Sequence, residues 1–206
     1  MNVMTERQFL EHLTGERWTG VKFLETAPSG ARPFARLCEA VQCSFKENLT
    51  VPCGTMECAG ALRSLGLGRH DEQMAWQMSE KTGMPLERAK GLLAATPILT
   101  RNVRAVELGA TDRPDVLIGY LRPEAAMKLL RHWQQITGRR LATELSSFTA
   151  VCTSLVAAHQ EKQPVFSFGC PDSRKYGGIG PDRLVAALPR EVVSQMMQES
   201  EDYAHI

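Results

Sequence analysis

The sequence predicts a mixed fold of helices and strands, α/β or α+β, in a chain of 206 residues. Helical periodicity and short apolar runs alternate along the chain, and no low-complexity segment or long linker separates them. With 43% hydrophobic and 23% charged residues, the chain has the composition of a globular protein with a sizeable core. A cysteine and glycine pattern also occurs twice. We therefore expect a single domain over residues 1–206, in which the repeat delimits two related, pseudo-symmetric halves of about residues 20–100 and 101–200.

Local signals define the N-terminal elements. Thr5 and Gln8 form the pattern of a capping box, which predicts a first helix. A short apolar run predicts a strand over Val21–Leu24, and residues 33–45 have the pattern of a helix that carries the first cysteine. Leu49–Val51 is then expected to form a short extended segment leading to further cysteines.

The middle of the chain combines two helices and two strands. Asp71 is expected to cap a helix that Gly83 ends, and Pro85 stands at the first turn of the next helix. Strands are predicted over Val103–Leu108 and Val116–Leu121. The second strand is almost wholly apolar, as expected of a strand that is covered on both faces.

The C-terminal elements complete the second half. A strongly periodic helix is predicted from Pro123 onward, and a cysteine-bearing helix is predicted to begin after Ser146 or Ser147. Pro164–Phe168 is expected to be a strand that delivers the last cysteine. Pro189 is expected to open the final helix.

The repeat is the most informative feature of the sequence. Each copy has a Phe-x3-Cys segment, a second cysteine after nineteen or seventeen intervening residues, and glycines eight and ten positions further on. Duplicated units tend to pack about a pseudo-twofold axis, so four cysteines should converge, and converging thiolates can hold a metal ion or an iron–sulfur cluster. The copies comprise Phe34, Cys38, Cys58, Gly66 and Gly68, and Phe148, Cys152, Cys170, Gly178 and Gly180.

We expect the four cysteines of the repeat to be metal ligands, with a 4Fe–4S cluster as the cofactor and zinc as the alternative. Glycines after a ligand permit positive φ angles and let backbone N–H groups approach an anionic centre. Two arginines at comparable places could offset thiolate charge, although surface ion pairs and simple tight turns would give the same pattern. The expected cofactor-binding residues are Arg63, Gly66, Gly68, Arg174, Gly178 and Gly180.

Two other kinds of function remain open at the level of the sequence. The protein could be a non-redox binder of a small molecule or anion, with buried cysteines or a structural zinc site. A cysteine nucleophile would need a histidine within reach, and His159 lies two helical turns, about 10 Å, from Cys152. The sequence therefore does not decide whether the protein is an enzyme.

Charge and hydropathy limit the partners. Lys and Arg number 24 against 23 Asp and Glu, which gives no electrostatic reason to expect a nucleic-acid partner. No apolar run is long enough to span a membrane, and the N-terminus lacks a signal-peptide pattern. We expect a cytoplasmic protein whose partner is a redox protein or a small molecule, and a homodimer remains open.

Several stretches of the chain resemble the family called domain of unknown function 169. The resemblance implies a cytoplasmic protein of a family frequent in anaerobic bacteria and archaea, without a settled activity. It also implies cysteines at the four positions of the repeat, with Cys43 and Cys53 outside the pattern. This chain has Cys-Ala-Gly and Pro-Asp-Ser where the family is expected to have Cys-Pro-Gly and Pro-Gly-Ser. The stretches are Leu37–Val41, Cys58–Ala61, Leu65–Leu67, Arg113–Tyr120, Arg122–Met127, Ala150–Cys152, Phe168–Arg174 and Leu184–Pro189.

Together these patterns favour an iron–sulfur protein that acts in electron transfer, or as an accessory in anaerobic redox or metallocofactor metabolism.

Overall fold

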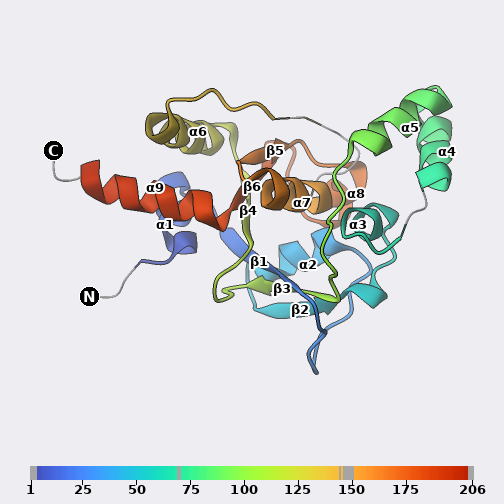
Figure 1. Cartoon of the computed structure of the whole chain (residues 1–206), viewed down its shortest axis with the longest axis horizontal. Helices are drawn as coiled ribbons and strands as arrows, with labels where there is room; N and C mark the ends of the chain where they lie inside the picture. The colour runs from blue at the N-terminus through green and yellow to red at the C-terminus, as the bar shows by residue number, and fades with distance from the viewer. Residues whose placement is uncertain (1–3, 69–70, 144, 146–150, 204–206) are drawn as a thin grey trace.

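A computed structural model describes residues 4–68, 71–143, 145 and 151–203. Its centre is a six-stranded sheet with the strand order β2-β3-β1-β4-β6-β5 (Figure 1). All five neighbouring pairs are antiparallel. The prediction of a mixed α and β fold is confirmed. The strands are β1 (Trp18–Leu24), β2 (Leu49–Pro52), β3 (Ala105–Gly109), β4 (Val116–Leu121), β5 (Val165–Ser167) and β6 (Leu184–Pro189).

Helices cover both faces of the sheet in the described part of the chain. One group packs over the middle strands around one core, and a second group gathers on the opposite face around a larger core that includes three buried cysteines, Cys38, Cys53 and Cys152. None of these helices combines the length and apolar character that crossing a bilayer requires. The first group is α1 (Glu6–Thr14), α6 (Pro123–Thr137) and α9 (Arg190–Tyr203), and the second is α2 (Leu37–Ser44), α3 (Ala59–Ser64), α7 (Val151–Glu161) and α8 (Pro171–Tyr176).

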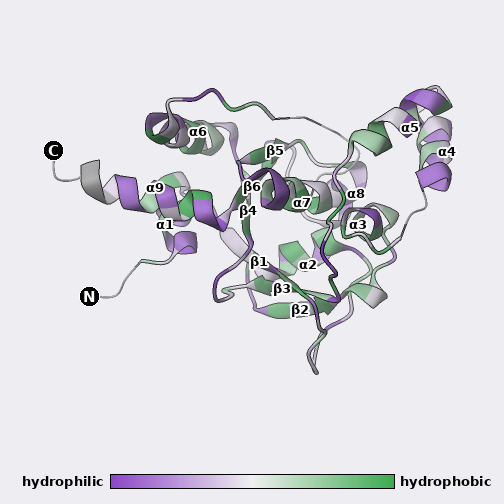
Figure 2. Cartoon of the chain, in the orientation of Figure 1, coloured by the Kyte–Doolittle hydropathy of each residue, from purple (hydrophilic) through white to green (hydrophobic). Residues whose placement is uncertain are grey.

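The two cores follow from the alternation of side chains along each strand. On β4, Val116 and Ile118 belong to the core under α2 and α7, whereas Leu117 and Leu121 belong to the core under α1 and α6. Every residue of this strand is buried, as predicted. Figure 2 shows the hydrophobic colouring on the central strands and on α2.

A helical hairpin projects from this body, where Figure 1 shows it at the right. It consists of α4 (Asp71–Thr82) and α5 (Leu86–Ala95), which pack against each other through their own small cluster of buried residues. The predicted helix start at Asp71 is confirmed, and Gly83 ends α4 with a φ of 70°.

Local signals were reliable at several helix ends. The capping box at the start of α1 is present, because the Gln8 amide N–H donates to Thr5 Oγ1 at 3.3 Å and the Thr5 N–H donates to Gln8 Oε1 at 2.9 Å. Gly138 ends α6 with a φ of 63°. The predicted start of the Cys152 helix at residue 146 or 147 lies outside the described residues, as does Phe148.

The predicted start of helix α2 was wrong, and β1 begins three residues earlier than predicted. Helix α2 begins at Leu37 and not at residue 33, because Arg36 is extended, with a φ of −135°. The carbonyl of Ala35 is not used within the helix, since it accepts hydrogen bonds from the N–H groups of Glu57 and Cys58 at 2.9 and 3.1 Å. The start of α2 is therefore set by a contact with the segment that carries the second cysteine.

Candidate functional site

The structure places the four cysteines of the repeat on four elements of one face of the sheet. Cys38 on α2 and Cys152 on α7 are buried members of the same core. Cys58 and Cys170 are half-buried against that core, and each is the N-cap residue of a six-residue helix, α3 or α8. The two copies therefore have the same local form, with one cysteine inside a helix and one at the start of a short helix.

Specific contacts tie these four elements together. The N–H of Cys58 donates to the carbonyl of Ala35, three residues before Cys38. The hydroxyls of Ser64 on α3 and Thr153 on α7 lie 3.2 Å apart in a hydrogen bond. Helix α8 ends at Gly177, where an added Cβ would lie only 2.9 Å from Cys38 Cβ. The close approach of α8 to α2 therefore depends on the absence of a side chain at residue 177.

The four thiols act on one another electrostatically. Burial, with smaller contributions from the charges of Cys170, Cys152 and Cys58, raises the pKa of Cys38 to about 12. Burial likewise raises the pKa of Cys152 to about 12, with contributions from Cys58 and Cys170 that a hydrogen bond from the Ser64 side chain partly offsets. At neutral pH, Cys38 and Cys152 are neutral thiols, and a cationic metal centre would be needed to hold them as thiolates.

The thiols are nevertheless not gathered around one point. Among the described residues, no three His, Cys, Asp or Glu side chains are grouped so that they could hold a single metal ion. The four cysteines are thus near enough for their charges to interact, but their side chains are not grouped as a ligand set for one ion. This arrangement of the thiols helps to decide which metal cofactor they could hold.

Two glycines follow the second cysteine in each copy of the repeat. Only the first of them has the same backbone conformation in both copies. Gly66 and Gly178, eight residues after Cys58 and Cys170, have φ angles of 74° and 67°. Gly68 and Gly180 are not in the positive-φ region, so the +10 glycines do not share this conformation. Only the +8 glycine of each turn needs the left-handed backbone that favours glycine.

The two predicted arginines are used for structure. Arg63 is 3% exposed, pairs with Asp71 at 2.6 Å and donates to the carbonyls of Thr96 and Leu93 at 3.1 and 2.5 Å, so it anchors the α4–α5 hairpin. Arg174 donates to the carbonyls of Gly180 at 2.8 Å and Arg183 at 3.2 Å, which closes the turn after α8. Neither arginine is among the groups that shift the pKa of Cys38 or Cys152.

The remaining cysteines and His159 stand apart from this group. Burial raises the pKa of Cys53 to about 11, and Arg104 is the one charge that acts on it. Cys43 does not contribute to the pKa of Cys38 or Cys152. His159 packs edge-on against Phe23, with ring centroids 5.4 Å apart, and burial lowers its pKa. No histidine of the described residues is among the groups that act on Cys38 or Cys152.

Sequence reasoning missed Tyr120, which follows Gly119 in an apolar strand and was interpreted as core. Its side chain is 6% exposed, and within the described residues its hydroxyl has no hydrogen-bond partner. Burial raises the pKa of Tyr120, and the charges of Cys38 and Cys170 add to this effect. A buried O–H group that makes no hydrogen bond to this part of the chain therefore lies within electrostatic reach of two of the four cysteines.

The structure thus shows a mixed fold in which four cysteines lie on one face of the sheet. The chain belongs to the DUF169 family, described as "Uncharacterised ArCR, COG2043", which it matches over residues 16–199. It is also similar to an uncharacterised protein of Methanocaldococcus jannaschii, MJ0308, with 26% identity over 182 residues that cover 83% of this chain and 78% of that protein. No solved structure matches this chain.

Proposed function

We propose that Cys38, Cys58, Cys152 and Cys170 hold an iron–sulfur cluster of the 4Fe–4S type. The observation that carries this proposal is that four thiols from four separate elements lie within one another's electrostatic reach on one face of the sheet. When bound, such a cluster supplies one-electron transfer. The protein would then pass electrons to or from a redox protein or a small molecule, or serve as an accessory in redox or metallocofactor metabolism in the reducing cytoplasm.

The order of the elements supports the related proposal that the chain consists of two duplicated halves. In the first half, which on this reading extends to β3 at residue 109 and not to about residue 100, the order includes β1, α2, β2, α3 and β3, with the α4–α5 hairpin inserted between α3 and β3. Strand β2 pairs with β3, which pairs with β1. In the second half, β4, α7, β5, α8 and β6 include the same succession, and β5 pairs with β6, which pairs with β4. The antiparallel pair of β1 and β4 joins the halves, as a pseudo-twofold axis would require.

The spacing of the thiols favours a cluster over zinc. Four thiolates around one zinc ion each lie about 2.3 Å from the metal, so they must meet closely. In a cluster each cysteine binds a different iron, so its ligands stand further apart. Thiols that interact electrostatically but are not grouped for a single ion fit the second arrangement better.

The Tyr120 hydroxyl fits the same centre, because hydrogen bonds to sulfur stabilise the more negative, reduced state of a cluster. Replacing Tyr120 by phenylalanine should therefore lower the reduction potential of the bound cluster by tens of millivolts, since a net hydrogen bond of about 1 kcal/mol corresponds to roughly 43 mV for one electron. In metal-free protein the same change should be neutral or stabilising, since it removes an unsatisfied buried hydroxyl.

Redox titration of the loaded protein measures the expected fall in reduction potential. Denaturant unfolding of the metal-free protein measures the expected unchanged or increased stability. A Tyr176→Phe variant is the matched control, because this tyrosine is half-buried and stacks under Arg36, 4.0 Å from the ring centroid. If the reduction potential of the Tyr120→Phe variant were unchanged, the Tyr120 hydroxyl would not hydrogen-bond to the cluster.

The proposal as a whole is tested by anaerobic purification, with analysis of iron, zinc and acid-labile sulfide beside an absorption spectrum. We expect iron and sulfide of about four each per chain, and their loss when all four cysteines are replaced by serine. A Cys43→Ser, Cys53→Ser double variant is the control and should keep the full content. Zinc alone would reduce the centre to a structural site. Equal metal content in the native chain and the fourfold variant would refute the proposal.

A further inference from the structure

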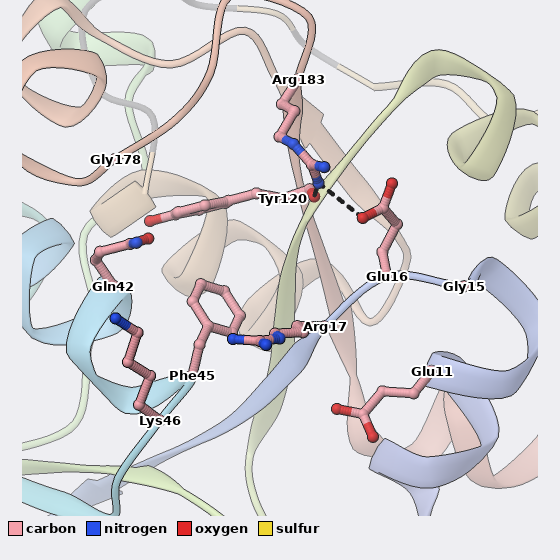
Figure 3. A pocket seen from close by; sticks show the side chains of 10 residues that line it. All are labelled: Glu11, Gly15, Glu16, Arg17, Gln42, Phe45, Lys46, Tyr120, Gly178 and Arg183. Carbon is pink, nitrogen blue, oxygen red and sulfur yellow. Dashed lines mark hydrogen bonds and ion pairs between the residues drawn. The ribbon is translucent and has the colours of Figure 1, made fainter.

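A cavity of about 670 Å³ opens beside the C-terminal end of α2, the helix that carries Cys38 (Figure 3). Its walls come from the turn between α1 and β1, the C-terminal end of α2, strand β4 and the glycine turn after α8. Tyr120 and Gly178, which lie at the cysteine site, also line this cavity. The size is that of a small-molecule site.

One carboxylate in the cavity wall is fully neutralised. Glu16, with its side chain 7% exposed, pairs with Arg122 and Arg183 at 2.7 Å each. Burial raises the pKa of Glu16, but the hydrogen bonds and charges of the two arginines outweigh burial and lower it. Arg183 also donates to the Tyr120 carbonyl at 2.8 Å, so this network fixes one wall of the cavity.

Two cations at the cavity are not neutralised in this way. Within the described residues, the side chains of Arg17 and Lys46 have neither an ion pair nor a hydrogen bond, and both residues are exposed at the cavity. The other lining carboxylate, Glu11, accepts a hydrogen bond from the Trp18 N–H at 3.4 Å. Glu11 keeps its charge, but the lining has three cations, Arg17, Lys46 and Arg183, against two carboxylates, so positive charge is in excess by one and is available to an anion.

The rest of the wall suits the carbon part of a ligand. The rings of Phe45 and Tyr120 lie edge to face, with centroids 5.2 Å apart, and Figure 3 shows Phe45 between the Lys46 and Arg17 side chains in this view. A Cβ at Gly178 would come within 2.7 Å of the Gln42 side chain, so glycine keeps this part of the cavity open.

We infer that the cavity binds a small organic anion, whose carboxylate or phosphate group contacts Arg17 and Lys46 and whose carbon part lies against Phe45. This inference deepens the proposed function, because Tyr120 and the Gly178 turn border both the cavity and the cysteines. Binding itself does not require a cluster. Only the role of the bound anion as a reactant of the centre rests on the proposed function.

The test is isothermal titration of the full-length protein with phenyl phosphate, benzoate and inorganic phosphate. We expect phenyl phosphate or benzoate to bind more tightly than inorganic phosphate, and the better of the two identifies the anionic group. An Arg17→Gln, Lys46→Gln double variant should weaken that binding about tenfold or more, the loss expected when charge-assisted hydrogen bonds are removed. The control is an Arg139→Gln, Arg140→Gln variant, which removes the same charge from exposed residues elsewhere and should change the affinity less than about twofold.

Two results would overturn the inference. One is the failure of all three probes to bind the native chain, and the other is an equal effect of the two double variants, which would indicate a response to net charge alone. Iron and sulfide analysis of the same samples keeps the two proposals separate. If the native chain retains metal but binds none of the anions, the cavity assignment is refuted. If the native chain contains no metal but still binds an anion, only the cluster is refuted.

Discussion

Replacing Trp18 by alanine is expected to lower the free energy of unfolding by about 3–5 kcal/mol, the usual cost of removing a large buried aromatic side chain. Trp18 is 1% exposed, and its indole N–H donates to Thr14 Oγ1 at 3.0 Å. Its ring covers Gly119 on the neighbouring strand, where an added Cβ would lie 2.8 Å away. Since whole domains are stable by only about 5–15 kcal/mol, this loss is a large fraction of the total free energy of unfolding.

Denaturant unfolding followed by far-UV circular dichroism measures this effect. Trp76 on α4 provides the matched control, because it is the same residue type and is 56% exposed. Trp76→Ala should change the unfolding free energy by no more than about 0.5 kcal/mol. Equal losses of unfolding free energy in the two variants would contradict the placement of Trp18 in the core between the sheet and helices α1, α6 and α9.

Much of the local structure could be predicted from short-range signals. The Thr5 and Gln8 pair and the C-terminal glycines of α4 and α6 act through the backbone of their own helix, so the sequence around them is sufficient. The apolar run of β4 was equally clear, because a strand buried on both faces is hydrophobic throughout. The repeat identified the four cysteines that the fold brings to one face.

The sequence was less informative where elements are short or are set by distant contacts. Helices α3 and α8, which precede the two glycine turns, were not predicted, since six residues are too few to display a helical period. Strand β6 was not predicted, although it lies inside the sheet between β4 and β5, because Leu184–Pro189 is a short apolar run without alternation. The true start of α2 depends on a hydrogen bond from Cys58, which no local pattern encodes.

The cavity could not be predicted for a related reason. Arg17, Lys46 and Tyr120 come from three elements far apart in the sequence, and each has an ordinary local interpretation as a surface cation or a core aromatic. Their combined chemistry arises only when β1, α2 and β4 are assembled. The predicted Arg63 and Arg174 illustrate the opposite case, because their suggestive positions after cysteines serve hydrogen bonds within the fold.

The second large effect is expected from Gly177→Val, which should abolish cofactor binding while leaving all four cysteines in the chain. An added Cβ at this residue would lie 2.6 Å from the Ser173 carbonyl oxygen and 2.9 Å from Cys38 Cβ, and both are part of packed helices that cannot yield easily. Because the φ of Gly177 is −88°, the obstacle is purely steric. Valine must push the end of α8 away from α2, and Cys170 at the start of α8 must move away from Cys38 with it.

We expect iron and sulfide per chain to fall to background in anaerobically purified Gly177→Val, together with a loss of unfolding free energy of about 1–3 kcal/mol from overpacking. Gly54→Val is the matched control, because an added Cβ at Gly54 meets no atom within 4 Å. If Gly177→Val retained native metal content and native stability, the contact between α2 and α8 would not be what brings Cys38 and Cys170 together. Because the variant alters packing and no thiol, its metal content separates a centre that depends on the fold from four cysteines that bind metal independently.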